Sequence, residues 1–127
     1  MKKAVIVIGK HGIGKSKTIR EFLKPKLGIS KNKHIFELKG KKGYILSQSF
    51  EETKKTPKKI EEAIKKYCHY EYLVLAGRPI EEKNSHTKET KQLCEQCKYN
   101  VLTVEITSSN LGHYEKKAND IFNYLNK

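Results

Sequence analysis

The chain has 127 residues, with 27 Lys and Arg against 14 Asp and Glu, which gives a formal net charge of +13. This length fits one domain over residues 1–127 and leaves little room for a second. The longest apolar stretch, residues 4–8, is far too short to span a bilayer, and the first residues lack the pattern of a secretory signal. We therefore expect a soluble, cytoplasmic protein that does not bind a membrane.

The positive charge is concentrated in the first half of the chain. Residues 1–66 hold 19 of the 27 basic residues and 6 of the 14 acidic ones, so this half carries the whole excess. A strongly basic segment attracts polyanions. The expected partner is therefore a nucleic acid, an acidic protein or a phosphorylated ligand. A solvated lysine-rich surface is the alternative, and the oligomeric state stays open.

Two residue types are scarce enough to exclude some mechanisms. Asp120 is the single aspartate, and Arg20 and Arg78 are the only arginines. The sequence therefore excludes a mechanism that needs two aspartates or a cluster of arginines.

The first predicted element is a buried strand over residues 3–8, a β-branched run closed by Gly9. A glycine-rich turn follows, and then a helix over residues 15–23 that Pro25 is expected to end. Residues 34–39 and 43–49 are strand-like, and the four residues 40–43 between them predict a hairpin turn.

In the second half, Thr56 and Pro57 predict the start of a helix, as its N-cap and first residue. Residues 71–76 form a second predicted buried strand, followed by a helix near residues 87–98 and a strand over residues 101–106. Residues 108–110 can cap a final helix, whose predicted apolar face is Tyr114, Ala118, Ile121, Phe122 and Leu125.

This order of elements predicts an α/β fold. Strands that are apolar throughout and alternate with helices indicate a mostly parallel sheet with helices on both faces, a three-layer α/β/α sandwich. The strand over residues 34–39 can lie antiparallel at an edge, as part of a hairpin.

Residues 9–16, GKHGIGKS, match the pattern G-x-x-x-x-G-K-[ST] at every fixed position. They also follow a predicted buried strand and open a predicted helix, which is the context that the pattern requires. Glycines let the backbone wrap around a phosphate, so that its N–H groups and the helix N-terminus face the anion. Lys15 can reach the outer phosphates and the Ser16 hydroxyl can hold Mg²⁺. The expected nucleotide-binding residues are Gly9, Lys10, His11, Gly12, Ile13, Gly14, Lys15, Ser16 and Lys17.

On this motif the chain resembles the P-loop NTPase superfamily, which implies that it binds ATP or GTP with Mg²⁺. The family usually carries a second motif, an apolar strand that ends in an acid. The strand over residues 71–76 instead runs into Gly77 and Arg78, so the family pattern breaks there.

Another polar cluster follows the strand-like stretch that begins at Gly43. Gln48 or Glu51 there could orient an attacking water, and Glu51 could hold magnesium through water. Arg78 is expected at the same sheet edge, where a guanidinium could stabilise charge on the transferred phosphoryl group. The candidate catalytic residues are Lys15, Gln48, Glu51 and Arg78, with Ser16 and Glu51 as metal ligands; ordinary surface positions are the alternative for Gln48, Glu51 and Arg78.

Cys94 and Cys97 have the spacing of a metal or redox pair, with Cys68 upstream. A zinc site is disfavoured because the fourth ligand would have to come from His69, adjacent to Cys68 rather than spaced from it. We expect Cys94 in the core and Cys97 partly exposed. Three cysteines without a secretory signal favour a reducing compartment.

Three functions remain open. The first is a Mg²⁺-dependent NTPase, the second a small-molecule or nucleotide kinase, and the third a nucleotide-binding module that does not hydrolyse. The pattern Asn-Lys-x-Asp of Ras-like GTPases is absent, because Asn32 and Lys33 are followed by His34 and Ile35. This favours ATP over GTP.

Overall fold

The computed structural model describes residues 2–127 and is built on a five-stranded sheet with the strand order β2-β3-β4-β1-β5. β1 pairs in parallel with both β4 and β5, and β3 pairs in parallel with β4. β2 pairs antiparallel with β3 and lies at the edge. The predicted α/β class with a mostly parallel sheet is therefore confirmed. The strands are β1 (Lys2–Ile8), β2 (Ile35–Leu38), β3 (Lys41–Ile45), β4 (Tyr72–Gly77) and β5 (Tyr99–Glu105).

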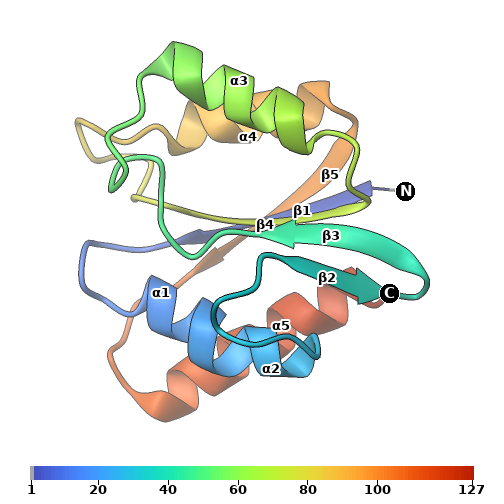
Figure 1. Ribbon diagram of the computed structural model, residues 1–127. Coiled ribbons are helices and arrows are strands. Elements are labelled where there is room, and N and C mark those ends of the chain that lie inside the picture. Colours follow the sequence, from blue (N-terminus) through green and yellow to red (C-terminus); the bar gives the residue numbers. More distant parts are fainter. Residues whose placement is uncertain (1) are drawn as a thin grey trace.

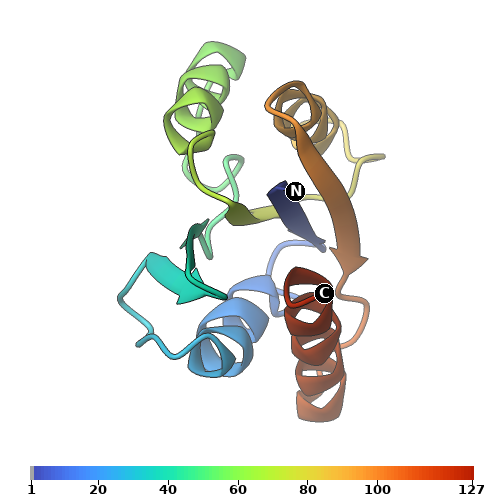
Figure 2. The ribbon, with the colours of Figure 1, turned by 90° about the vertical axis from the view of Figure 1, so that its right-hand side faces the viewer.

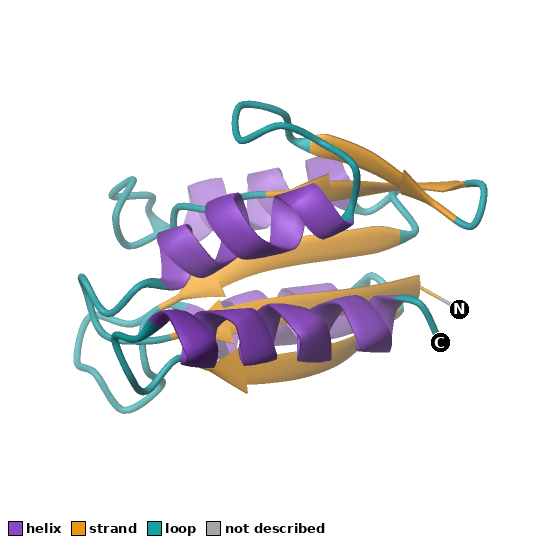
Figure 3. Ribbon diagram, turned by 90° about the horizontal axis from the view of Figure 1, so that it is seen from below, coloured by secondary structure: helices purple, strands orange, loops and turns teal. Residues whose placement is uncertain are grey.

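Helices cover both faces of this sheet. In Figure 1, α3 and α4 lie above the strands and the segments α1, α2 and α5 below them, and the turned view in Figure 2 separates the same two groups. Seen from below in Figure 3, the helices run roughly along the strands. The helical segments are α1 (Lys15–Lys17), the π-helix η1 (Thr18–Leu23), α2 (Lys24–Lys26), α3 (Pro57–Tyr67), α4 (Thr87–Gln96) and α5 (Leu111–Leu125).

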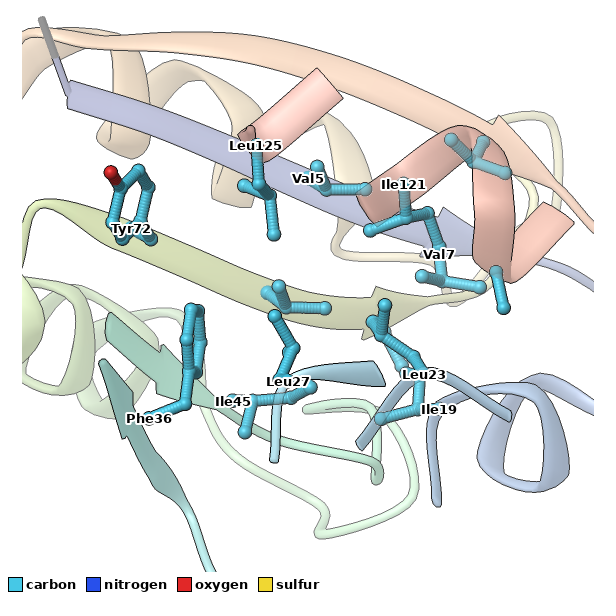
Figure 4. Close-up of a cluster of buried hydrophobic side chains, with 14 of the residues drawn as sticks. Val5, Val7, Ile19, Leu23, Leu27, Phe36, Ile45, Tyr72, Ile121 and Leu125 are labelled. Carbon is cyan, nitrogen blue, oxygen red and sulfur yellow. The ribbon is translucent and has the colours of Figure 1, made fainter. Parts of the chain in front are cut away.

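Two apolar clusters, one on each face, hold the sheet between its helices. The cluster beneath the sheet combines Val5 and Val7 of β1 with Ile19 and Leu23 of η1 and with Ile121 of α5. Figure 4 shows these side chains pointing toward one another between the strands and the helices. Each is fully shielded from water, and burying such a side chain contributes about 1.5–3 kcal/mol. The strand carrying the glycine-rich loop is thus anchored in the core.

The first helical region does not end before Pro25, so that prediction is wrong. Residues 15–26 are continuously helical, and the N–H of Lys24 donates to the carbonyl of Ile19, five residues earlier. In an α-helix a proline removes one hydrogen bond and its ring clashes with the carbonyl four residues back. The wider π turn directly before Pro25 gives the ring room, which is a physical reason for the helix to continue to Lys26.

The hairpin turn begins one residue earlier than predicted and has two residues instead of four. Lys39 and Gly40 form the turn, with φ of 55° and 75°, while Lys41 and Lys42 already belong to β3. Gly43 ends the predicted turn and also begins the predicted strand-like stretch. It is a strand residue, and a Cβ there would collide with the ring of Phe36 on β2. Close packing, and not a turn, requires this glycine.

The helix starts are confirmed. The side chain of Thr56 caps α3 by accepting from the N–H of Lys59 at 3.3 Å, with Pro57 as the first residue. The side chain of Asn110 caps α5 by accepting from the N–H of His113 at 2.7 Å. Of the predicted face of α5, Phe122 is partly buried and the other four residues are buried. Within residues 2–127 no helix is long and apolar enough to cross a membrane.

Cys68 and Cys97 form a disulfide, with their Cα atoms 5.8 Å apart. The sequence does not predict this pair, because the spacing of Cys97 relates it to Cys94, its neighbour in the predicted helix. Cys94 is buried in the core as expected, and burial raises the pKa of its thiol to about 12. Cys68 follows α3 and Cys97 follows α4, so the bond joins the ends of two helices on one face of the sheet.

Replacing Cys68 with serine should lower the free energy of unfolding of the oxidised protein by about 3 kcal/mol, because the bond closes a loop of 29 residues in the unfolded chain. Urea unfolding of both proteins, each with and without reductant, measures this difference. Reductant should shift only the wild-type curve. Equal midpoints under oxidising conditions would contradict the expectation.

Candidate functional site

The loops that follow β1, β3 and β4 come together at one edge of the sheet. Because these strands are parallel, their carboxyl ends face the same way, and Figure 1 shows their loops gathered at the left. This edge is where open α/β sheets bind ligands. The sequence-predicted site residues all belong to these loops or to the helix that the first loop opens.

The glycine-rich loop, residues 9–14, connects the buried strand β1 to α1. The N–H of Gly9 donates to the carbonyl of Gly77 at 3.1 Å, which ties the loop's start to β4. Gly12 and Gly14 have φ of 79° and 122°, a backbone conformation that residues with a Cβ rarely adopt. After Gly14 the chain enters the helix, and the first N–H groups of a helix have no carbonyl partner within it. Within the loop the N–H of Ile13 donates to the carbonyl of Lys10 at 3.1 Å, whereas the first N–H groups of the helix are available for a ligand.

The far end of the chain holds this loop in place. The hydroxyl of Tyr114, on α5, donates to the carbonyl of Ile13 at 2.7 Å, and the Ser109 hydroxyl donates to the same oxygen at 3.3 Å. Gly14 lies so close to the Tyr114 ring that a Cβ on Gly14 would overlap it. Sequence reasoning assigned Tyr114 only to the apolar face of the helix. The sequence could have indicated this second role, because the hydroxyl of a buried tyrosine usually needs a hydrogen-bond partner.

Lys15 points back into the loop. Its side chain is 3% exposed, and its ammonium group lies 2.6 Å from the carbonyl oxygen of Gly9 and 4.0 Å from a carboxylate oxygen of Glu52. Burial lowers the pKa of Lys15, while the nearby negative charge of Glu52 opposes this and Arg78 adds to it. A cation with so little water around it interacts strongly with a neighbouring anion.

A cavity of about 380 Å³ opens over the loop. It brings together six of the predicted nucleotide-binding residues with two residues that the sequence alone does not assign to the site, Glu52 and Tyr114. The lining residues are His11, Gly12, Gly14, Lys15, Ser16, Lys17, Glu52 and Tyr114.

A comparison of the chain with known protein families, curated protein sequences and solved structures gives no significant match.

Glu51 and Glu52 face different surroundings. The carboxylate of Glu51 accepts a short hydrogen bond from the N–H of His86, directly before α4. Glu51 lines a second cavity of about 440 Å³, together with Arg78 and His86. Glu52 faces the loop and Lys15. Both carboxylates are near enough to favour the charged form of Lys15, but only Glu52 lines the cavity over the loop.

Arg78 lies at the predicted edge, directly after β4. Its Nη1 pairs with Glu82 at 3.2 Å, and its carbonyl accepts hydrogen bonds from Ser85 and Thr87. Within residues 2–127, its Nε is a buried donor with no hydrogen-bond partner. The guanidinium therefore carries a buried Nε–H whose hydrogen bond is not satisfied by the described residues.

Gln48 and Glu52 line different cavities. Gln48 lines a third cavity, of about 280 Å³, which Ser16 also lines. Ser16 is thus shared by the cavity over the loop and the one beside Gln48. Within residues 2–127 no three His, Cys, Asp or Glu side chains are grouped as a metal cage. An ion at this edge would need other oxygen ligands.

Proposed function

We propose that the protein binds a nucleoside triphosphate, ATP in preference to GTP, through residues 9–17, and hydrolyses its γ-phosphate with Mg²⁺. The observation that carries the proposal is the buried ammonium of Lys15, held inside a glycine loop that leads from a buried strand into a helix. Helices on both faces of the sheet support the interpretation of the chain as a three-layer α/β/α P-loop domain.

Phosphate binding follows from the polar groups that converge on the cavity. Loop and helix N–H groups carry partial positive charge and favour an anion. Lys15, which in the free protein donates to the Gly9 carbonyl, exchanges this neutral acceptor for a charged phosphate oxygen. The new bond joins two opposite charges, which attract each other more strongly than the ammonium attracts a neutral carbonyl.

Magnesium fits the residues at this edge if the nucleotide supplies most of its ligands. Mg²⁺ keeps several waters and takes one or two protein oxygens together with phosphates, so a preformed protein cage is not required. Ser16 would hold the ion with its hydroxyl, and a Glu51 or Glu52 carboxylate would hold it through water. When bound, the ion neutralises charge on the outer phosphates.

For hydrolysis, a polar group must orient water toward the outer phosphate. Glu52 lies 4.0 Å from Lys15, which makes it a stronger candidate than Glu51, whose carboxylate is used by the start of α4. Gln48 is a second candidate, through the cavity that it shares with Ser16. Arg78, whose positive charge acts on Lys15, can stabilise charge on the phosphoryl group.

The test is ATP turnover by the purified protein with Mg²⁺, followed as released phosphate and as product nucleotide. Equal amounts of ADP and free phosphate support hydrolysis. Turnover that requires an added pool of metabolites or nucleotides supports a kinase instead. Nucleotide binding without turnover supports a non-hydrolysing module, and no binding at all contradicts the proposal.

Glu52→Gln should lower turnover about 100-fold while nucleotide affinity changes less than about threefold, since a positioned carboxylate contributes roughly 10²–10⁴ to a rate. Glu51→Gln is the matched variant, with the same charge removed from the neighbouring residue. We expect it to retain turnover within about threefold. Steady-state turnover and nucleotide titration of both variants measure the split. The reverse result would assign the role to Glu51, and normal turnover in both would exclude either carboxylate.

A further inference from the structure

The cavity beside Gln48 has a chemistry that nucleotide binding does not account for. It is about 280 Å³ in volume and opens between the first helical region, the segment that follows it, and the end of β3. Its lining includes Arg20, Lys24, Lys31, His34, Ser16 and Gln48. Three of these side chains are cations, and no carboxylate lines the cavity.

In the part of the chain that the structure describes, the positive charge of this cavity is not paired with a carboxylate. Lys24 is 1% exposed, and its ammonium group donates to the carbonyl of Lys31 at 2.7 Å. Within residues 2–127 no carboxylate lies within 4.0 Å of Lys24, Arg20 or Lys31. Burial and the charge of Arg20 lower the pKa of Lys24. An unpaired buried charge is unfavourable unless an anion accompanies it.

The local fold brings the cations together. Arg20 lies on the π-helix η1, and Lys24 begins α2 directly after it. The chain then turns at Gly28, which has a φ of 75°, and returns so that the Lys31 carbonyl reaches Lys24. π turns are rare in proteins. Those that occur often lie at functional sites.

We propose that this cavity binds the phosphomonoester group of a second ligand. Such a group carries about −1.5 to −2 charges at pH 7 and three strong acceptor oxygens. Lys24 supplies a fixed buried cation, and the exposed Arg20 and Lys31 can close on the anion from solvent. His34, Gln48 and Ser16 add polar groups for the remaining oxygens.

A nucleic-acid strand fits this cavity less well. A backbone phosphodiester carries one negative charge, and its neighbours on both sides keep it on the protein surface. The Lys24 side chain is almost fully covered, so an anion must enter the hollow to approach it. A terminal phosphate group can do so.

The site has a defined position relative to the proposed nucleotide. Because Ser16 lines both cavities, the second phosphate would lie beside the outer phosphates of the nucleotide. This relative position rests on the proposed function. The anion site itself does not.

The experiment is a titration of the ¹⁵N-labelled wild-type protein with inorganic phosphate, followed by amide chemical shifts. Shifts at residues 31–34 and 46–48 report this cavity, and shifts at residues 11–14 report the loop, because Ser16 lines both cavities. Arg20→Gln and Lys31→Gln each remove one exposed cation, so both variants should fold. Lys59→Gln on α3, across the sheet, is the matched control with the same loss of charge.

We expect saturable shifts at residues 31–34 and 46–48, with affinity about tenfold weaker in each cavity variant and unchanged in Lys59→Gln. Equal affinity in all four proteins, or no saturable shift there, would overturn the proposal. The proposal would also be overturned if the cavity variants lost affinity only for an oligothymidine without terminal phosphates. That result would assign the surface to nucleic acid. Phosphate binding here in a protein that fails to bind ATP would refute the proposed function and leave this site standing.

Discussion

Replacing Lys15 with alanine should weaken ATP binding at least about 100-fold. The Lys15 ammonium is 3% exposed and lies within the loop, so its charge acts on a bound phosphate with little screening by water. Losing a charged hydrogen bond of about 3 kcal/mol corresponds to roughly a hundredfold change in affinity. Titration with a fluorescent ATP analogue measures the loss.

Two further variants separate binding from folding. Lys15→Met retains most of the buried aliphatic chain and removes only the charge, whose burial opposes folding. Its free energy of unfolding should therefore lie within about 1 kcal/mol of the wild-type value. Lys59→Ala on α3 should bind like the wild type. ATP affinity in Lys15→Ala within threefold of the wild type would contradict the assignment of the loop.

Gly14→Ala should both destabilise the protein by about 2–4 kcal/mol and abolish nucleotide binding. Gly14 has a φ of 122°, and a Cβ there would overlap the Tyr114 ring, which is 5% exposed in the core. Strained backbone costs about 1–3 kcal/mol, and overpacking costs a similar amount. Relief of the overlap requires the loop to move away from α5, which displaces the N–H groups that face the ligand.

Gly12→Ala is the matched control in the same loop. Gly12 has a φ of 79°, but a Cβ there meets no atom within 4 Å. Only the backbone strain remains, so we expect a loss of about 1–2 kcal/mol. Urea unfolding of both variants measures the difference. Equal losses of stability would show that the contact between Gly14 and Tyr114 does not hold the loop.

The sequence predicted most of the sheet because its strands are encoded locally. Residues 4–8 and 72–77 are unbroken apolar runs, which is what a strand covered on both faces requires, and both are fully buried. The helix starts are equally predictable from local sequence. The side chains of Thr56 and Asn110 cap their helices by accepting a hydrogen bond from the N–H three residues later in the chain. The loop pattern of residues 9–16 also falls at the predicted junction of strand and helix.

The features that sequence reasoning missed depend on contacts across the chain. Tyr114 lies 101 residues from Ile13, and the partner of Cys97 lies 29 residues away at Cys68. Contacts between residues so far apart in the sequence leave no local pattern from which they could be predicted. The prediction that the helix ends before Pro25 is wrong because the wider π turn upstream removes the clash that normally ends a helix at proline. Glu51 and Glu52 cannot be distinguished from their spacing alone, and only the fold directs one to His86 and the other to Lys15.

Hydrogen exchange of the wild-type protein, with and without saturating Mg·ATP, tests the central claim most directly. If the loop binds phosphates through its backbone, the amides of residues 9–17 should exchange more slowly with nucleotide, while those of α3 should not change. Unchanged exchange in residues 9–17 at saturating nucleotide, or protection confined to another part of the chain, would contradict the account.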